Sequence, residues 1–320
     1  MIQTLLTGAS GFVGSGLIAP LLERQHQVTA AMRVLKADLD PRVKQGLVGD
    51  LSPEQDWQAV LKGQQLVIHL AARVHVMSDA STDPLAEYRR VNVEGTLNLA
   101  RQAAAAGVKR FIFISSIKVN GESTTAGAPY TADGPTAPTD PYGVSKKEAE
   151  QGLRALSSET GMEVVIIRPV LVYGPGVQAN FLNMMRWLHK GLPLPFGAVN
   201  NRRSLVALDN LVDLIVTCTE HPGAANQTFL VSDGEDLSTT MLLRRMATAL
   251  NKPARLLPVP SWVLETGASA LGRGALAQRL CGSLQVDIGK TRDVLGWAPT
   301  SSVDEALRKT GKHFLELQSK

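Results

Sequence analysis

A glycine-rich turn near the start of the chain limits most strongly what this sequence can fold into. Gly8, Gly11 and Gly14 are spaced three residues apart, between the apolar run 2–7 and a stretch with helical spacing that extends to Pro20. Glycines let the backbone approach an anion without a Cβ in the way, and the following helix would direct its unpaired N–H groups at a phosphate. Strand, glycine turn and helix in this order are typical of a dinucleotide-binding fold. On its own, the triplet is equally compatible with an ordinary tight turn.

Length and composition place the chain among globular proteins with a sizeable core. It has 320 residues, of which 44% are hydrophobic, and a net charge of +4 without a run of like charges. That mild basicity suits an anionic small molecule as well as a nucleic acid, so it discriminates little between them. We expect neither a nucleic-acid partner nor a metal site. Cys218 and Cys281 lie in apolar surroundings, which indicates core thiols of a reduced compartment. No apolar stretch reaches about 18 residues and Met1 leads straight into the first strand, so we expect a cytoplasmic protein without a membrane partner.

Strand and helix patterns alternate through the first half of the chain. Apolar runs at 2–7, 27–32, 46–49, 66–70, 111–115 and 164–168 are separated by helical patterns, the clearest at 85–106 and 142–160. Near-continuous apolar strands joined by helices are what a parallel sheet covered on both faces requires. We therefore predict an α/β fold in which residues 1–169 form a Rossmann-type, doubly wound parallel sheet that binds a dinucleotide.

Beyond Pro169 the pattern becomes less regular, and proline, glycine and asparagine recur. Helical patterns remain at 181–189, 208–220, 239–250 and 303–317, and one short apolar run lies at 228–231. We predict that residues 170–320 form a smaller C-terminal lobe that shapes a substrate site. This lobe would be interwoven with the main sheet, to which one strand returns.

A tyrosine and a lysine four residues apart suggest chemistry at the end of the predicted sheet. Tyr142 and Lys146 share one face of the helix predicted after Asp140. A phenol with a pKa near ~10 is a poor base, but an adjacent ammonium would lower that pKa and let Tyr142 exchange a proton with a substrate oxygen. Ser115 and Ser116 end a strand at the edge where open α/β sheets bind ligands. The alternatives are a solvated helix face for the Tyr–Lys pair and a strand end or cap for the serines.

Together, these motifs resemble one enzyme family. Gly8-x-x-Gly11-x-x-Gly14, Leu70-Ala71-Ala72, Ser115-Ser116, Tyr142-x-x-x-Lys146 and Arg168-Pro169 occur in the order found in extended short-chain dehydrogenase/reductases, in the branch of NAD(P)-dependent nucleotide-sugar epimerases and dehydratases. Tyr173-Gly174-Pro175, residues 202–209 and Leu295-Gly296-Trp297 continue the resemblance through the second half. Residues 192–206 look like a bacterial branch described as UDP-glucose 4-epimerase-like, which includes 4-ketoreductases of lipopolysaccharide biosynthesis.

The resemblance implies roles for individual residues. Tyr142 would be the proton donor and acceptor, Lys146 would bond the nicotinamide ribose and lower the pKa of Tyr142, and Ser116 would hold the substrate oxygen. Asn180 and Arg202 would grip the diphosphate of a UDP-sugar. Besides Tyr142 and Lys146, the residues implied at the cofactor are Gly8, Ser10, Gly11, Phe12, Val13, Gly14, Arg33, Asp50, Leu51, Leu70, Ala71, Ala72, Ser115 and Pro169, with His69 beside them.

Three departures from the family pattern bear on the reaction. Met32 and Arg33 stand where NAD-binding relatives carry an aspartate, and Arg33 could pair with a 2′-phosphate, which favours NADP over NAD. Ile117 and Lys118 replace the Asp-Glu pair of the dehydratases, and neither cysteine lies near the motifs, unlike in fucose-synthase-type enzymes. Of the reactions in this family, hydride transfer at sugar carbon 4 remains as the expected one. A reductase consumes hydride and suits NADPH, so a preference for NADP favours a reductase of a UDP-4-keto-hexosamine over a UDP-hexose 4-epimerase. A reductase of a hydrophobic ketone and a non-catalytic cofactor-binding sensor stay as more distant alternatives.

The resemblance also implies a homodimer. The helices at 85–106 and 142–160 would pack against their symmetry mates. Ala149, Leu153 and Leu156 look like a second apolar face that a sheet-covering helix would not otherwise need. We therefore expect these three side chains at a contact between two copies of the chain.

Overall fold

The part of the chain that the structure describes, residues 1–74, 83–270, 272 and 274–319, contains a main sheet of seven parallel strands. The computed structural model gives them as β1 (Gln3–Thr7), β2 (Gln27–Met32), β3 (Lys44–Leu47), β4 (Leu66–His69), β5 (Arg110–Ile114), β6 (Glu163–Pro169) and β9 (Thr228–Val231). Their order in space is β3-β2-β1-β4-β5-β6-β9, which reverses between β1 and β4. This is the arrangement of a doubly wound fold, and it confirms the predicted α/β architecture.

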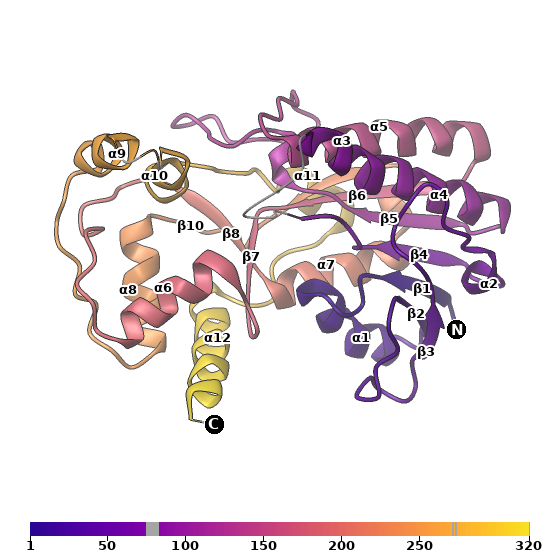
Figure 1. Cartoon of the computed structure of the whole chain (residues 1–320), viewed down its shortest axis with the longest axis horizontal. Helices are drawn as coiled ribbons and strands as arrows, with labels where there is room; N and C mark the ends of the chain where they lie inside the picture. Colours follow the sequence, from indigo (N-terminus) through magenta and orange to yellow (C-terminus); the bar gives the residue numbers. More distant parts are fainter. Residues whose placement is uncertain (75–82, 271, 273, 320) are drawn as a thin grey trace.

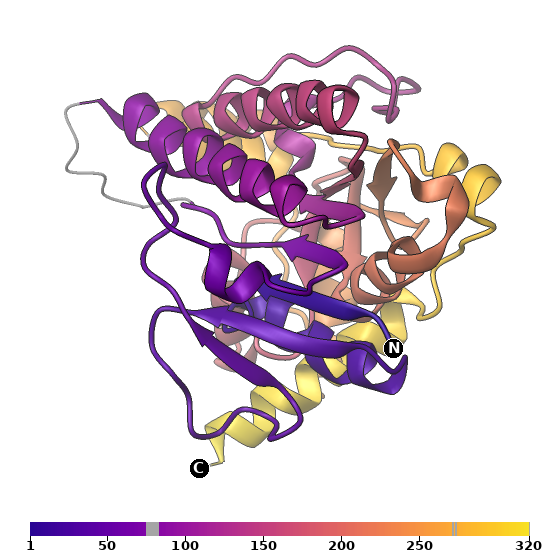
Figure 2. The same ribbon diagram turned by 90° about the vertical axis from the view of Figure 1, so that its right-hand side faces the viewer.

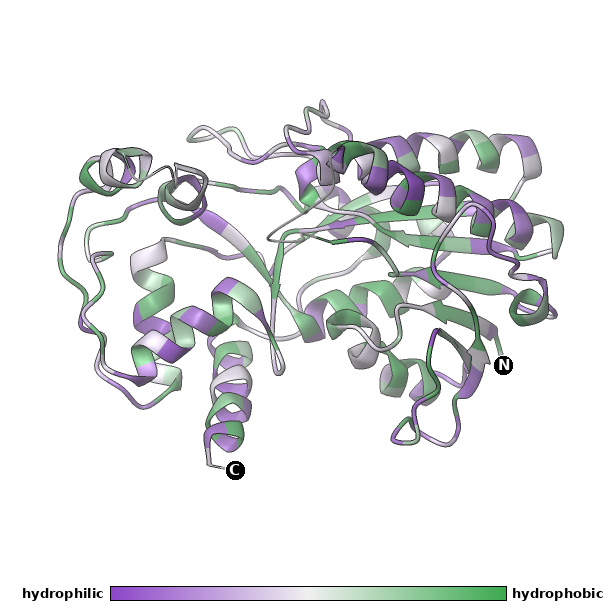
Figure 3. Cartoon of the chain, in the orientation of Figure 1, coloured by the Kyte–Doolittle hydropathy of each residue, from purple (hydrophilic) through white to green (hydrophobic). Residues whose placement is uncertain are grey.

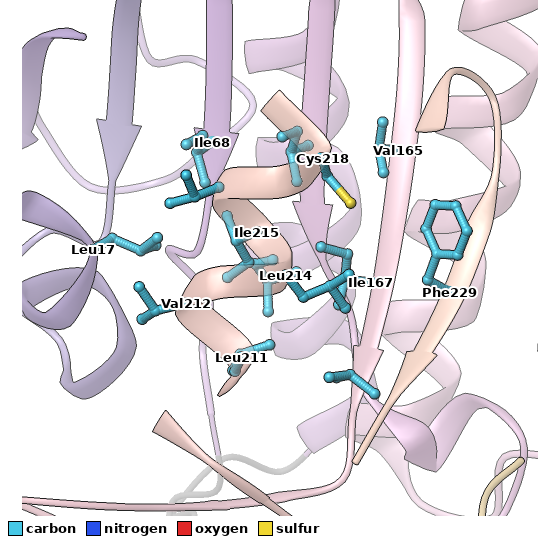
Figure 4. Packing of buried hydrophobic residues seen from close by; sticks show 14 of the residues in the cluster. Leu17, Ile68, Val165, Ile167, Leu211, Val212, Leu214, Ile215, Cys218 and Phe229 are labelled. Carbon is cyan, nitrogen blue, oxygen red and sulfur yellow. The ribbon is translucent and has the colours of Figure 1, made fainter. Parts of the chain in front are cut away.

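Helices cover both faces of this sheet. On one face lie α1 (Phe12–Glu23) and α7 (Leu208–Glu220), and Figure 4 shows Leu17 and Ile215 from these helices packed toward Ile68 of β4 and Ile167 of β6. On the other face, α3 (Pro84–Tyr88), the π-helical segment η1 (Arg89–Gly95) and α4 (Thr96–Ala105) follow one another beside α5 (Pro141–Thr160) (Figure 2). The short helices α2 (Gln58–Leu61) and η2 (Ile117–Val119) lie in connections on the same side.

The second half of the chain completes the main sheet as well as forming a lobe of its own. β9 pairs with β6, and α7 fills the core under β4, β5 and β6. η3 (Pro222–Ala224) and α11 (Gly289–Leu295) pack together close to β9. The returning strand predicted at 228–231 is thus confirmed. The domain boundary at residue 169 stays a prediction, because later residues contribute to the first core.

Within the described residues, a second sheet of three strands organises the smaller lobe. β8 (Arg203–Ala207) lies between β7 (Leu171–Tyr173) and β10 (Asp236–Leu237). α6 (Ala179–His189), α8 (Thr239–Ala249) and α12 (Val303–Gln318) enclose a separate core, while α9 (Ser261–Ala270) and α10 (Gly274–Cys281) lie at the far end of the lobe (Figure 1). Phe12, the first residue of α1, packs against both cores, so the glycine turn lies where the lobe meets the sheet. None of the helices described combines the length and apolar character of a membrane span.

Three local expectations differ from the structure. α1 continues through Pro20 to Glu23, because losing the single N–H of Pro20 does not prevent the next turn, in which Arg24 N–H donates to the Pro20 carbonyl at 3.1 Å. The helix expected at 85–106 contains the π-helical turn η1. The strand expected at 46–49 is β3, two residues earlier, because its pairing with β2 begins at Lys44 opposite Thr29.

The helix that carries Tyr142 begins and ends as the sequence predicts. Asp140 caps it, with Oδ1 accepting from Gly143 N–H at 2.6 Å, and Pro141 is its first residue. Gly161 ends it in a left-handed conformation, with φ of 74°. These signals fix the rotational position of Tyr142 and Lys146 relative to the sheet.

Gly14 offers a test of how tightly the turn is packed. A Cβ at Gly14 would overlap the carbonyl oxygen of Gly8, whereas a Cβ at Gly267, in the exposed helix α9, would meet nothing within 4 Å. We expect Gly14→Ala to lower the free energy of unfolding by about 1–3 kcal/mol. Gly267→Ala, the control, should change it by no more than about 1 kcal/mol, and upward, because alanine favours a helix. Chemical denaturation measures both, and equal midpoints for the two variants would contradict the packing argument.

Candidate active site

The loops that follow β1 and β4 meet at the point where the strand order reverses. Gly8 has a φ of +71°, and a Cβ there would lie 2.9 Å from the Ala71 nitrogen and 3.0 Å from the Leu70 carbonyl carbon. The hydroxyl of Thr7 accepts a hydrogen bond from Ala71 N–H at 3.2 Å. Open α/β sheets bind ligands at this switch point. The structure therefore brings Gly8, Leu70 and Ala71 together, as the sequence predicts.

The start of α1 has the features of an anion site. Gly11 N–H donates to the Gly8 carbonyl at 2.9 Å, and Gly11 is the N-cap but has no side chain to close the helix end. The first turn of α1 carries no acidic residue. Helix N–H groups without a side-chain cap, at the positive end of the dipole, suit a phosphate. Ser10 and Gly11 are exposed here, Phe12 and Val13 are half-buried, and Gly14 is buried against Gly8.

His69 supports these loops from inside the protein and does not face the site. Its ring is fully buried and hydrogen-bonds the Thr7 hydroxyl at 2.7 Å and the Thr96 hydroxyl at 3.0 Å. Phe111 and Phe113 lie beside the ring. Burial, with a smaller contribution from the nearby Lys146 charge, lowers the pKa of His69 to about 3, so the ring is neutral at physiological pH. The His69 side chain is thus directed into the interior, and the expectation that the segment 69–72 borders the cofactor stays a prediction.

Asn92, in the π-helical segment, is a site residue that the sequence reasoning missed. Its side-chain oxygen accepts from Arg73 N–H at 2.8 Å, and its amide donates to the Arg73 carbonyl and to the Ser145 hydroxyl, both at 3.0 Å. It thus ties the loop after β4 to the helix that carries Tyr142. A buried asparagine at a π-helical turn is typical of functional sites. The apparent helical periodicity of 85–106 gave no signal for it.

Tyr142 and Ser116 lie together at the end of β5. Their side chains are hydrogen-bonded to each other, and Tyr142 is half-buried, edge-on to the Tyr88 ring at 6.0 Å between centroids. The Ser116 hydroxyl also accepts from Lys118 N–H at 3.3 Å, so the serine caps η2 as well. The capping interpretation of Ser116 is therefore confirmed, and its role at a substrate oxygen stays a prediction. A phenol beside a hydroxyl is an arrangement that can share a proton with a substrate oxygen.

Lys146 is buried below Tyr142 and does not lower its pKa. Its ammonium donates to the Ile114 carbonyl at 2.9 Å and lies 4.4 Å from the centroid of the Phe113 ring, but 5.9 Å from that of Tyr142. Burial lowers the pKa of Lys146 to about 7, opposed by the Glu150 carboxylate. Burial, reinforced by Asp140 and Tyr88, raises the pKa of Tyr142 above its ordinary value, and only the Ser116 hydrogen bond opposes this. The expected depression of the Tyr142 pKa by Lys146 is therefore wrong for the protein without ligand.

A buried ion pair holds Ser115 and the helix α5 in place. Arg168 Nε and Nη2 donate to the Glu150 carboxylate at 2.8 and 2.5 Å, and both side chains are almost fully buried. Ser115 Oγ donates to the same carboxylate at 2.6 Å, and Arg168 Nη1 donates to Asn120 Oδ1 at 3.0 Å. The Ser115 hydroxyl is thus directed into the interior, so it is a structural anchor and not a hydroxyl facing the cofactor. Pro169 follows Arg168 and is half-buried at the end of β6.

Lys118, which stands where a dehydratase carries part of its acidic pair, forms ion pairs with two carboxylates. Its ammonium contacts the Asp140 carboxylate and donates to Glu122 Oε1 at 2.8 Å. Both carboxylates are thus engaged by a cation. In the described part of the chain, no three His, Cys, Asp or Glu side chains gather as a metal site would require.

Arg33 at the end of β2 has an acidic partner that the sequence reasoning overlooked. Its Nη1 donates to Asp50 Oδ1 at 2.7 Å, and both side chains are exposed, at 73% and 79%. Arg33 and Asp50 were both expected at the cofactor, but not as a pair. Leu51, next in the chain, is half-buried and packs against Gly95 of η1.

The smaller lobe contains the expected diphosphate residues and, in addition, two neighbouring arginines, Arg203 and Arg279. Asn180 and Arg202, the expected diphosphate residues, are both exposed, at the start of α6 and just before β8. Arg203 is half-buried and donates to the Gly282 carbonyl at 3.0 Å. Burial and the neighbouring Arg279 guanidinium lower the pKa of Arg203. The sequence gave no sign of Arg279, because 76 positions separate it from Arg203.

Glu150 tests how far the site depends on the buried ion pair. Glu150→Gln keeps the shape of the side chain but leaves the Arg168 charge buried without its partner, which should cost about 3–5 kcal/mol of unfolding free energy. Glu148→Gln is the control on the same helix, because Glu148 pairs with the more exposed Arg89 and such pairs are worth about 1 kcal/mol or less. Chemical denaturation should separate the two variants clearly. Similar losses in both would show that the buried pair has no special structural role.

Comparisons with known proteins agree with this geometry. Residues 4–232 match the model of the NAD dependent epimerase/dehydratase family. A Vibrio cholerae protein described as UDP-glucose 4-epimerase is 50% identical over 318 residues, which cover 99% of this chain and 96% of the relative. A Mycolicibacterium neoaurum 3-beta-hydroxysteroid dehydrogenase is 28% identical, over 98% of this chain and 92% of the relative.

A solved structure shows the same fold. The UDP-glucuronic acid 4-epimerase of Bacillus cereus, in complex with UDP-glucuronic acid and NAD, superposes with a TM-score of 0.80. The match covers 99% of this chain and 100% of that one, at 22% identity, so it supports the architecture alone. Together with the family match and the Vibrio cholerae relative, these findings show that the chain belongs to the NAD dependent epimerase/dehydratase family and is an enzyme of the short-chain dehydrogenase/reductase type.

Proposed function

We propose that the protein is a 4-epimerase of a UDP-hexose or UDP-N-acetylhexosamine that works with a bound NAD. The observation that carries the proposal is the intact Tyr142–Ser116 pair above Lys146 in a chain that is 50% identical to a UDP-glucose 4-epimerase. A sensor would not need a phenol hydrogen-bonded to a hydroxyl at the carboxyl edge of the sheet. The relative also favours the epimerase over the 4-reductase that Met32 and Arg33 suggest from sequence.

The residues around the switch point fit a dinucleotide. At Gly8 and Gly14 the backbone segments lie so close together that a Cβ would collide with neighbouring backbone atoms. The N-terminus of α1 has no side-chain cap, so its N–H groups can bind an anion. The pyrophosphate would be held there, with the backbone of Leu70, Ala71 and Ala72 alongside. The chemistry that NAD supplies when bound is reversible hydride exchange with the sugar carbon.

The protein's own groups would manage the proton. Ser116 would hold the 4-oxygen of the sugar beside the phenol, and Tyr142 would take the hydroxyl proton and return it to the same oxygen. The raised pKa of Tyr142 keeps the phenol protonated in the protein without ligand, which suits the return step. Lys146, whose pKa is lowered to about 7, would gain charge where a ribose hydroxyl or a phenolate comes within reach. An epimerase needs both directions of this transfer within one turnover.

The diphosphate of the substrate would lie in the smaller lobe. Two neighbouring guanidiniums that disfavour each other's charge are stabilised by an anion between them, and Arg203 with Arg279 form such a pair. We propose these residues for the diphosphate, together with Arg202 and Asn180 at its rim. Binding energy from this remote group would hold carbon 4 at Tyr142.

One of the two arguments for a homodimer was an outward apolar face on α5, and the structure does not contain this face. Ala149, Leu153 and Leu156 are buried against the sheet within one chain, beside Phe111 and Val164. The expectation that they form a second, outward apolar face is therefore wrong. A homodimer through α4 and α5, and a cytoplasmic role in surface-polysaccharide synthesis, remain proposals that rest on the family resemblance.

Epimerisation itself can be tested with one substitution. Purified protein incubated with UDP-glucose or UDP-N-acetylglucosamine should form the galacto isomer without net change in NADH absorbance. Tyr142→Phe should still bind NAD but lose about 10²–10⁴-fold in turnover, because the proton transfer is removed. Trp187→Phe, on α6, is a control that should keep full activity. Consumption of NADPH by a 4-keto sugar without any epimerisation would support the reductase, and unchanged turnover of Tyr142→Phe would refute the proton role.

The cofactor preference separates the epimerase from the 4-reductase, which Arg33 still favours. A 2′-phosphate would have to displace Asp50 from Arg33, and an exposed ion pair of this kind is worth only about 1 kcal/mol or less. If the reductase is correct, Arg33→Ala should weaken NADP by about tenfold or more while leaving NAD nearly unaffected. Asp50→Asn should instead strengthen NADP. For the epimerase we expect tighter binding of NAD in the wild type, measured by fluorescence titration, and a small effect of either substitution on NADP.

A further inference from the structure

The helix α9, at the far end of the smaller lobe, has no buried residue. It packs along α10, and the two helices lie at the edge of the molecule (Figure 1). Helices of soluble proteins normally bury one apolar face. Among the described residues, α9 thus contacts α10 without burying any of its side chains.

The exposed apolar side chains are large and lie close together in sequence. Leu257, Trp262 and Val263 are exposed by 52%, 69% and 38%, and Pro258 and Pro260 between them are exposed as well. Figure 3 shows apolar residues in green along this segment and on α9. The backbone here is fixed, since Leu257 N–H donates to the Leu194 carbonyl and its own carbonyl accepts from Gly197 N–H, both at 2.8 Å. Leu257 is thus exposed on a backbone that is hydrogen-bonded to the neighbouring segment 194–197.

The same surface is basic. Lys252, Arg255 and Arg279 are exposed on these segments, against the single acidic residue Glu265 between positions 251 and 282. A ten-residue helix is about 15 Å long, too short to cross a bilayer but long enough to lie in its interface. Tryptophan and basic side chains next to exposed aliphatic ones are typical of helices that bind at a membrane surface.

We propose that this surface, formed by Lys252, Arg255, Leu257, Trp262 and Val263, binds the surface of a bilayer that contains anionic lipids. A second copy of the chain fits less well, because a two-fold contact would place the basic patch against itself. An anionic membrane satisfies both the apolar side chains and the positive charges. The proposal is compatible with the lack of a spanning helix among the described residues, since contact at a surface needs none.

The contact would bring the substrate site near the membrane. Arg279, proposed above for the diphosphate, is on α10, which packs along α9. A protein bound through α9 would therefore hold this part of the substrate lobe next to the lipid headgroups. The lipid contact itself does not rest on the proposed epimerase activity, because it concerns a face outside the Tyr142 site.

Sedimentation with vesicles tests the proposal. The full chain should pellet with vesicles of equal parts phosphatidylcholine and phosphatidylglycerol, and much less with phosphatidylcholine alone, and added salt should release it. Trp262→Ser should weaken the partitioning by about tenfold, because a large apolar side chain no longer inserts. Trp187→Ser, which removes a half-exposed tryptophan from α6, should partition as the wild type does. Arg255→Glu should weaken binding to the anionic vesicles only.

Three results would overturn the proposal. The first is a wild-type chain that stays in the supernatant with both kinds of vesicle, and the second is a Trp262→Ser variant that pellets as well as the wild type. The third is a loss of dimer mass in light scattering on that substitution, which would show that the surface is a contact between two copies of the chain. Because Trp262 is exposed, the variant should unfold at the wild-type denaturant concentration. Turnover of a soluble UDP-sugar is measured on the same samples. Turnover without vesicle binding would contradict only the membrane proposal, and vesicle binding without turnover would contradict only the proposed epimerase.

Discussion

Glu150 and Arg168 bring a negative and a positive charge into the interior of the protein, where desolvation costs several kcal/mol for each ion unless all their bonds are satisfied. Here they are satisfied: the carboxylate accepts from Arg168 twice and from Ser115, and the guanidinium also reaches Asn120 and the Ala132 carbonyl. The partners come from the segment after β5, from α5 and from β6. The network therefore fixes Ser115, directly after β5, and Arg168 of β6 against the helix that carries Tyr142.

The same low-polarity surroundings set the charges of the reactive groups. Burial raises the pKa of Tyr142 and lowers that of Lys146 to about 7, so both groups tend toward their neutral forms at physiological pH. Glu150, one turn after Lys146, is the group that opposes the loss of the lysine charge. The buried ion pair thus has an electrostatic consequence besides a structural one. A phenol that starts protonated is already prepared to give a proton to a sugar oxygen, and the harder step is to accept one.

Local pattern predicted the fold well, because parallel strands and their helices are encoded by neighbouring residues. The caps of α5 at Asp140 and Gly161, and the returning strand at 228–231, follow from such short-range signals. What the sequence did not reveal depends on contacts between distant positions: Arg33 with Asp50, Asn92 with Arg73, and Arg203 with Arg279. The expectation that Leu153 faces outward was wrong for the same reason, because its surroundings depend on distant residues. A helix can have several apolar stripes, and only the packing decides which one faces the sheet.

Phe12 shows why the two parts of the molecule act as one. It begins α1 at the glycine turn, and it packs against both the core of the main sheet and the core of the smaller lobe. α7 and β9, which come late in the chain, complete the core beneath β4, β5 and β6. The first 169 residues alone would expose that apolar surface to water, at a cost of roughly 25 cal/mol for each Å². The folded main sheet therefore requires the second half of the chain, and the packing of Phe12 against both cores connects the smaller lobe to that sheet.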